Sequence, residues 1–228
     1  MNIRRSARRW CGAVAIATGS PLAAAAQMPA TPVLQNAWTN AGITAALDYG
    51  HAQSANAWAA ALAWSPQQAR FQLSLGGGVI KDSTASRGGY GGRLAVPLVS
   101  FAGGSIGTAA FGGVGYSGQG GVSMSNFPVG VSLGWRHALG ATRGISAYVA
   151  PFYSLMRLKV TADSATGRAA TNASKGFFRA SVGLDVTLAP QIGLTVGYEA
   201  GSQAKDPDPG PRGGVFGVAV SYALRRQQ

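Results

Sequence analysis

One short pattern constrains this chain more than any other feature, because it recurs about ten times between residue 41 and the end of the chain. In each copy, large apolar side chains alternate with small or polar ones over about ten residues, and a turn follows. Alternation with a period of two places successive side chains on opposite faces of a β-strand. The pattern is clear near the C-terminus and softer in 105–116 and 144–157. It predicts strands at 41–50, 57–65, 69–80, 89–98, 105–116, 127–137, 144–157, 176–188, 191–200 and 213–224.

The composition excludes several classes of protein. Only 11% of the 228 residues are charged, against about 25% in average globular proteins, while 46% are hydrophobic and 34 residues are glycine. The mean hydropathy is only +0.12 and there is no second long apolar stretch, which excludes a polytopic helical membrane protein. Glycine costs about 1 kcal/mol at each position inside a helix. The composition therefore predicts a β-rich chain whose outer surface does not face water over much of its area.

The first 26 residues are typical of an export signal. Arg4, Arg5, Arg8 and Arg9 precede a mostly apolar stretch, and small residues at 23–26 supply a cleavage site before Gln27. A membrane anchor is the alternative, but the stretch is shorter than the ~20 apolar residues that span a bilayer. We therefore expect a signal peptide at 1–26, an N-terminal lead-in at 27–40 and one barrel domain at 41–228. The lone Cys11 lies in the leader, so the exported chain depends on hydrogen bonds and packing instead of disulfides.

Periodicity alone does not decide which strand face points inward. In 213–224, for example, Phe216, Val220 and Tyr222 share one face, and Gly217 and Ala219 share the other. Three features favour an arrangement with the large residues outside. The small face carries too few charges to cover a surface in water, and the strands match the ~9–11 residues that cross a bilayer at a tilt. Aromatic residues lie near strand ends, as in the girdles of membrane barrels: Tyr49, Trp58, Trp64, Tyr90, Tyr116, Trp135, Tyr198 and Tyr222.

The connections also favour a membrane barrel. They are short at 66–68, 99–104, 138–143 and 189–190, and mostly longer and more polar at 51–56, 81–88, 117–126, 159–175 and 202–212. Short periplasmic turns alternating with long external loops are typical of outer-membrane barrels. We predict an all-β fold, an antiparallel up-and-down transmembrane β-barrel of about ten strands. Eight strands are the alternative if one weak pair lies outside the wall.

The leader, the strands and the closing segment resemble the small outer-membrane β-barrel proteins of Gram-negative bacteria, a broad family with porin-like and adhesin-like members. The resemblance covers about residues 40–226, and its motif is Gly217-x-x-Val220-x-Tyr222, although the chain ends in Arg-Arg-Gln-Gln instead of an aromatic residue. It implies residence in the outer membrane, contact with lipid and lipopolysaccharide, and recognition of the last strand by the barrel-assembly machinery.

Seven charged residues fall on the predicted inner face: Asp48, Arg70, Arg93, Arg136, Arg179, Asp185 and Glu199. One interpretation is a set of interior ion pairs and hydrogen bonds, such as Arg179 with Glu199 on the neighbouring strand. The other is a narrow passive-diffusion pore, in which four arginines against three acids would slightly favour anions. We therefore expect a structural or pore-forming barrel.

Two other functions compete with this one. Long loops, above all 159–175, could bind a ligand or mediate adhesion. A barrel-embedded lipid or peptide hydrolase would need a histidine beside an acid, but His51 and Asp48 lie an odd number of residues apart and so on opposite faces. We predict no enzyme, no catalytic residues, no metal, no cofactor and no nucleic-acid partner, because no motif for them is present.

Overall fold

The computed structural model describes residues 41–52, 55–66, 70–82, 85–162, 169–205 and 213–225. The expected signal peptide and lead-in lie outside the described residues. The described chain forms ten strands and one short 3-10 turn, η2 (Ala102–Gly104). The strands are β1 (Gly42–Ala52), β2 (Ala55–Ser65), β3 (Gln72–Lys81), β4 (Ser86–Phe101), β5 (Ile106–Gln119), β6 (Val122–Ala138), β7 (Gly144–Val160), β8 (Thr171–Ala189), β9 (Ile192–Gly201) and β10 (Val215–Arg225).

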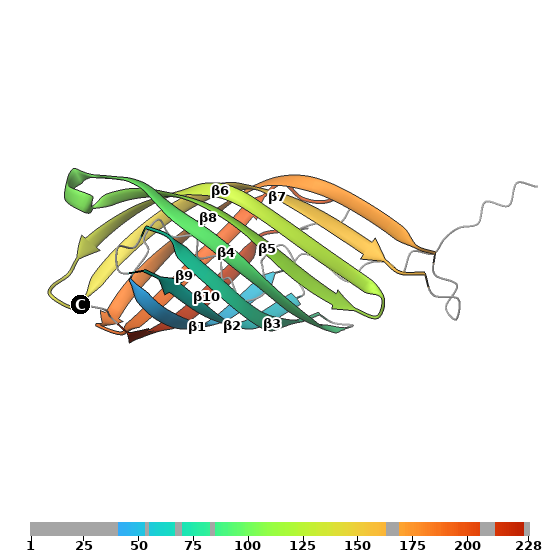
Figure 1. Ribbon diagram of the computed structural model, residues 1–228, viewed down its shortest axis with the longest axis horizontal. Coiled ribbons are helices and arrows are strands. Elements are labelled where there is room, and N and C mark those ends of the chain that lie inside the picture. The colour runs from blue at the N-terminus through green and yellow to red at the C-terminus, as the bar shows by residue number, and fades with distance from the viewer. Residues whose placement is uncertain are drawn as a thin grey trace, which may run out of the picture.

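Each strand pairs antiparallel with its neighbours in the chain, and β1 pairs with β10 to close the barrel (Figure 1). This confirms the predicted up-and-down barrel, and the eight-strand alternative is wrong because all ten strands belong to the wall. Closure leaves no strand edge without a hydrogen-bonding partner. Among the described residues, no helix has the length and hydrophobicity to cross a membrane.

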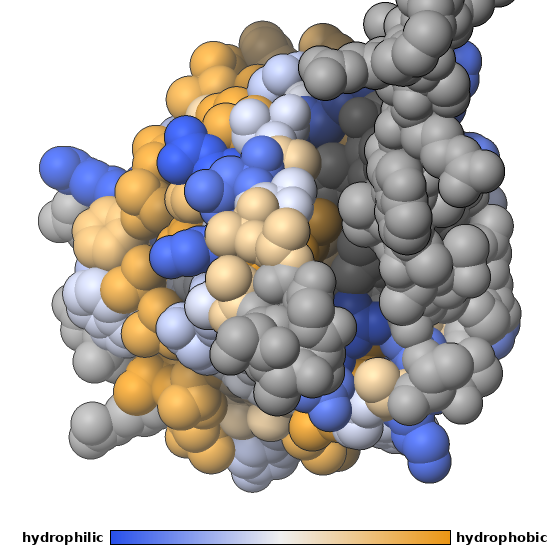
Figure 2. All heavy atoms as spheres, turned by 90° about the vertical axis from the view of Figure 1, so that its right-hand side faces the viewer, coloured by the Kyte–Doolittle hydropathy of each residue, from blue (hydrophilic) through white to orange (hydrophobic). Residues whose placement is uncertain are grey.

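The large apolar side chains point outward, as predicted. Leu184 and Val220 are half exposed on the outer face, and Phe178 is 68% exposed. The residues that alternate with them, such as Ser181 and Ala219, are buried inside the barrel. Figure 2, which looks onto one end of the barrel, shows hydrophobic residues along the flank of the wall and hydrophilic residues near the mouth. The barrel is therefore apolar outside and largely small or polar inside.

Several strands are longer than the pattern predicts. β6 and β7 have 17 residues each and β8 has 19, and most of their extra residues lie at one end, which we call the long-loop end. In Figure 1 the ends of β7 and β8 extend past those of β1–β3 at this end. The outward side chains of β7 are apolar from Ile145 to Leu155 and are then Arg157 and Lys159. The predicted strand boundaries follow the apolar pattern. The backbone hydrogen-bond ladder continues beyond the residue where that pattern stops, so the observed strands are longer.

This extension also shortens some predicted loops. Longer connections follow β7 and β9, at 161–170 and 202–214, but the strand bounds leave only 53–54, 82–85 and 120–121 between the other pairs at this end. The expectation of longer loops there was wrong. Gly120 and Gly121 have φ of +57° and +78°, the left-handed conformation that a two-residue hairpin turn requires. The ends of these strands extend beyond the apolar region, so their polar composition is similar to that of loops.

Glycines inside the barrel make room for aromatic rings on neighbouring strands. A Cβ atom at Gly130 would overlap the carbonyl oxygen of Pro151 and lie 2.8 Å from the ring of Phe111. The ring of Tyr148 lies over Gly183 in the same way. The strand glycines at these positions therefore allow large side chains to lie across the lumen.

We expect Gly130→Ala to destabilise the barrel by about 1–3 kcal/mol, because the added methyl group overpacks the rings inside it. The midpoint of urea unfolding in lipid vesicles measures this change. Gly112→Ala is the matched control, since a Cβ atom there would approach other atoms no closer than 3.8 Å. Equal midpoints for the two variants would contradict this packing role.

Candidate functional site

The lumen has two unlike halves, and the first is bulky. Strands β4–β8 send large buried side chains inward, among which Phe111 and Phe152 pack edge to face with ring centroids 6.2 Å apart. Tyr148 belongs to the same buried cluster, and Met156 and Phe177 form another. These side chains fill the lumen from one side. We call this half the bulky half.

The other half, from β9, β10 and β1–β3, carries mostly Ala, Gly, Ser and Thr on its inner face, and we call it the small half. Asp48 lies in its middle, between Ala59 on β2 and Ala219 on β10. Its side chain is 6% exposed, and neither carboxylate oxygen has a hydrogen-bond partner. A buried carboxylate without a partner in the described part of the chain is costly and thus a candidate for binding a cation.

Arg179 and Glu199 form the ion pair that their positions on adjacent strands predicted. Both are 2% exposed. The Arg179 guanidinium also donates to the carbonyl oxygens of Ser202 and Gly213, at 3.1 Å each. These two carbonyls lie at the start and the end of the long β9–β10 connection. One buried guanidinium therefore holds both ends of this connection against the wall.

The structure separates the other predicted lumen charges. Asp185 accepts a hydrogen bond from Ser146 at 3.0 Å, and Arg93 is buried beside the bulky cluster. Arg70 and Arg136 are exposed at the end opposite the long loops, where Arg136 Nε donates to the Gly104 carbonyl at 2.9 Å. They therefore do not join the buried charges. The expected small anion preference depended on counting all seven residues as one set.

Seven of the eight predicted girdle residues are exposed on the outer face, and Tyr49 is half-buried against Trp58. They lie near both ends of the wall. Trp64, Trp135 and Tyr222 are at the end opposite the long-loop end, which we call the short-turn end. The other five are at the long-loop end. The structure adds exposed aromatic residues that the predicted girdle lacks, among them Phe127, Tyr153, Phe178 and Phe216. Their alternation with inward residues was the signal that could have identified them.

The closing strand places Gly217 inside and Val220 and Tyr222 outside. Its pairing with β1 closes the wall, and its use as an assembly signal stays a prediction.

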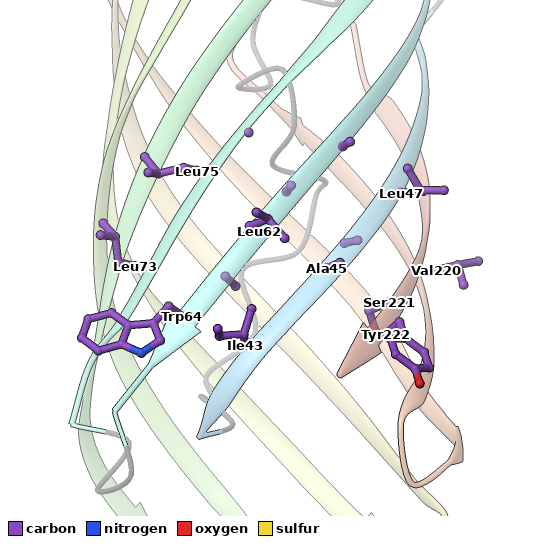
Figure 3. A pocket seen from close by; sticks show the side chains of 15 residues that line it. Ile43, Ala45, Leu47, Leu62, Trp64, Leu73, Leu75, Val220, Ser221 and Tyr222 are labelled. Atoms are coloured by element: carbon purple, nitrogen blue, oxygen red, sulfur yellow. The ribbon is translucent and has the colours of Figure 1, made fainter. Parts of the chain in front are cut away.

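Strands β1–β3 and β10 form an apolar hollow of about 780 Å³ on the outer wall, and Figure 3 shows side chains from these strands around the hollow. Its lining includes Ile43, Leu47, Leu62, Trp64, Leu75 and Tyr222.

The two histidines lie away from the buried acids. His51 is exposed and its Nδ1 is 2.8 Å from Asn56 Oδ1, whereas Asp48 faces inward, so the two occupy opposite faces as predicted. His137 is exposed and stacks on Trp135 at the short-turn end. No group of three or more potential metal ligands occurs among the described residues.

No family model and no curated protein sequence matches this chain. Among solved structures, the chain is similar to the N-terminal β-barrel domain of Pseudomonas aeruginosa OprF, with a TM-score of 0.40, 6% identity, and coverage of 80% of this chain and 97% of that one. It is also similar to the KdgM porin in complex with disordered oligogalacturonate, with a TM-score of 0.41, 10% identity, and coverage of 80% of this chain and 99% of that one. A third similar structure is that of Neisserial surface protein A, with a TM-score of 0.37, 13% identity, and coverage of 82% of this chain and 100% of that one.

The bulky half is the feature of the site that sequence reasoning missed. Phe111, Tyr148 and Phe152 point inward from β5 and β7, the two strands whose pattern was soft. Large residues on both faces of a strand weaken the alternation between large and small. The weak alternation in 105–116 and 144–157 was therefore the sequence signal for side chains that fill the lumen.

We expect Arg179→Ala to lower the free energy of unfolding by about 3–5 kcal/mol, because it leaves Glu199 buried without a counter-charge. Urea unfolding in lipid vesicles measures the loss. Arg136→Ala, which removes one exposed hydrogen bond, should cost about 1 kcal/mol or less. The double variant Arg179→Met with Glu199→Gln should recover part of the loss, and a double variant as unstable as Arg179→Ala would refute the proposed role of the unpaired charge.

Proposed function

We propose that this chain is an integral outer-membrane β-barrel whose small half lines a narrow path for small hydrophilic solutes, with a preference for cations. The observation that carries the proposal is Asp48, a buried carboxylate without a hydrogen-bond partner among the described residues, in the middle of a wall of small side chains.

The outer surface supports residence in a membrane. A continuous apolar band covers the wall, and the outward apolar stretch from Ile145 to Leu155 has the length of a strand that crosses a bilayer. Exposed aromatic residues lie near both ends of the wall, where amphipathic rings suit the membrane–water boundaries. Export by a cleaved signal peptide, contact with lipid and lipopolysaccharide, and recognition of β10 by the assembly machinery belong to the same proposal.

The uneven lumen supports a path along one wall. The bulky half occupies one side with aromatic rings, and a barrel of about this size can be filled by its side chains. Opposite, the inward residues of β2 are alanines and Ser65, and the inward residues of β1 are Gly, Thr, Ala and Asp48. These side chains have a smaller volume than the rings opposite, and we place the path on this side.

The charges of the small half support a preference for cations. Glu199 neutralises Arg179, and Asp82 pairs with Arg87 near the long-loop end. Asp48 has no such partner in the part of the chain that the structure describes. A mobile cation beside its carboxylate would offset the cost of burying the charge, and a carboxylate in a narrow path favours cations over anions.

The membrane part of the proposal predicts heat-modifiable migration in gels. The full chain folded in detergent should migrate differently before and after boiling, because closed ladders of backbone hydrogen bonds resist the detergent until heated. Electrophoresis of paired samples measures the shift. A band at the same position in both samples would contradict a stable barrel.

The pore part predicts ion conduction that depends on Asp48. In a planar bilayer with a KCl gradient, the wild-type protein should show conductance steps and a reversal potential of cation-preferring sign. Asp48→Asn removes the charge with little change of volume and should lower the ratio of potassium to chloride permeability several-fold.

Asp82→Asn is the control, because Asp82 lies in the β3–β4 connection and is bound to Arg87. It should leave the reversal potential close to that of the wild type. Absence of conductance steps would eliminate the pore and leave a structural barrel. Conductance with anion preference, unchanged by Asp48→Asn, would eliminate the role of Asp48.

A further inference from the structure

The outer faces of β6, β7 and β8 carry a regular polar array at the long-loop end. Strand pairing places Arg157 between Ser125 and Ser174, and Lys159 between Ser123 and Asn172. Because Arg157 and Lys159 are two residues apart on β7, both point outward, and both are exposed. We call this array the outer basic face; it consists of Ser123, Ser125, Arg157, Lys159, Asn172 and Ser174.

The outer basic face begins where the apolar band ends. In the adjacent row, Leu155 on β7 pairs with Phe127 on β6 and with Gly176 on β8, so the change to polar residues occurs at the same level on the three strands. Tyr153 and Phe178 lie on the apolar side, with ring centroids 5.9 Å apart. The Arg157 guanidinium lies 5.5 Å from the centroid of the Phe127 ring. This array therefore stands at the edge of the membrane-facing band.

Among the described residues, the charges on the outer surface at this end have one sign. The four acidic residues of the described chain, Asp48, Asp82, Asp185 and Glu199, are buried or face the lumen. The lysines and arginines on the outward face of the strands at the long-loop end are Lys81, Arg157 and Lys159, within the described ranges. Of the described strands, β7 alone presents two of these cations, Arg157 and Lys159, at successive outward positions. An anion would meet attraction there without a described carboxylate opposing it.

We propose that the outer basic face binds the phosphate groups of lipopolysaccharide in the outer leaflet; this rests on the proposed placement in the outer membrane. Arg157 donates paired N–H groups to one phosphate, and Lys159 supplies a second positive charge. The flanking hydroxyl and amide groups donate further hydrogen bonds. The acyl chains lie against the apolar band beneath, so both ends of the lipid meet complementary surface.

The test uses the full chain in phosphatidylcholine nanodiscs with added diphosphoryl lipid A, and measures bound lipid A by native mass spectrometry. Arg157→Ala with Lys159→Ala should weaken binding roughly 30-fold, since each cation near an anionic surface contributes about a fivefold factor. Arg157→Lys with Lys159→Arg, which keeps both charges, should retain most of the binding. Lys81→Ala is the matched control, because Lys81 is also outward and exposed at this end but has no second cation beside it, and it should bind like the wild type.

Three outcomes would overturn the proposal. Equal binding of dephosphorylated lipid A would show that the acyl chains alone are recognised. Equal loss in Lys81→Ala would show attraction by diffuse surface charge, and competition by millimolar inorganic phosphate would show a site for soluble anions. Insertion of all variants into the nanodiscs separates these outcomes from a failure of the membrane placement itself, which would abolish insertion of the wild type.

Discussion

Closure of the backbone hydrogen-bond ladder is the constraint on which the rest of this structure depends. The pairing of β1 with β10 gives every strand two neighbours, so peptide groups facing the apolar outside are satisfied within the wall. Only after closure does each strand acquire an inside and an outside. The alternation of large and small residues then gives the wall an apolar outer surface and a separate inner face.

The lumen shows how one closed wall holds two environments. Aromatic side chains such as Phe111 and Phe152 fill the bulky half because the inward glycine at 130 leaves space beside them. The small half keeps Asp48 among alanines. Packing is thus concentrated on one side, and the unpaired charge is left on the other. The proposed conduction path follows from this division.

The outer surface shows a second division, along the strands instead of around the barrel. The ladder of β6–β8 continues past the apolar band, and the outward residues change there from Leu155 to Arg157 and Lys159. Hydrogen bonding sets the length of a strand, whereas the apolar residues on its outer face set the part that suits a membrane. The two lengths differ on β6–β8, and the outer basic face is built on the difference.

The sequence by itself determined where most strands lie and which residues share a face, because a period of two in hydrophobicity is local and survives without knowledge of neighbours. Strand length, aromatic positions and composition, added to that period, predicted which face points outward, and the closed wall decided for ten strands over eight. The sequence also predicted that Arg179 and Glu199 would meet, since they lie on consecutive strands. Only the tertiary structure decided where the ladders end, that Arg70 and Arg136 stand apart from the buried charges, and that Asp48 has alanines as neighbours on both sides. These properties depend on register and on which side chains meet across a closed wall, and strand pairing over long separations carries no local signal.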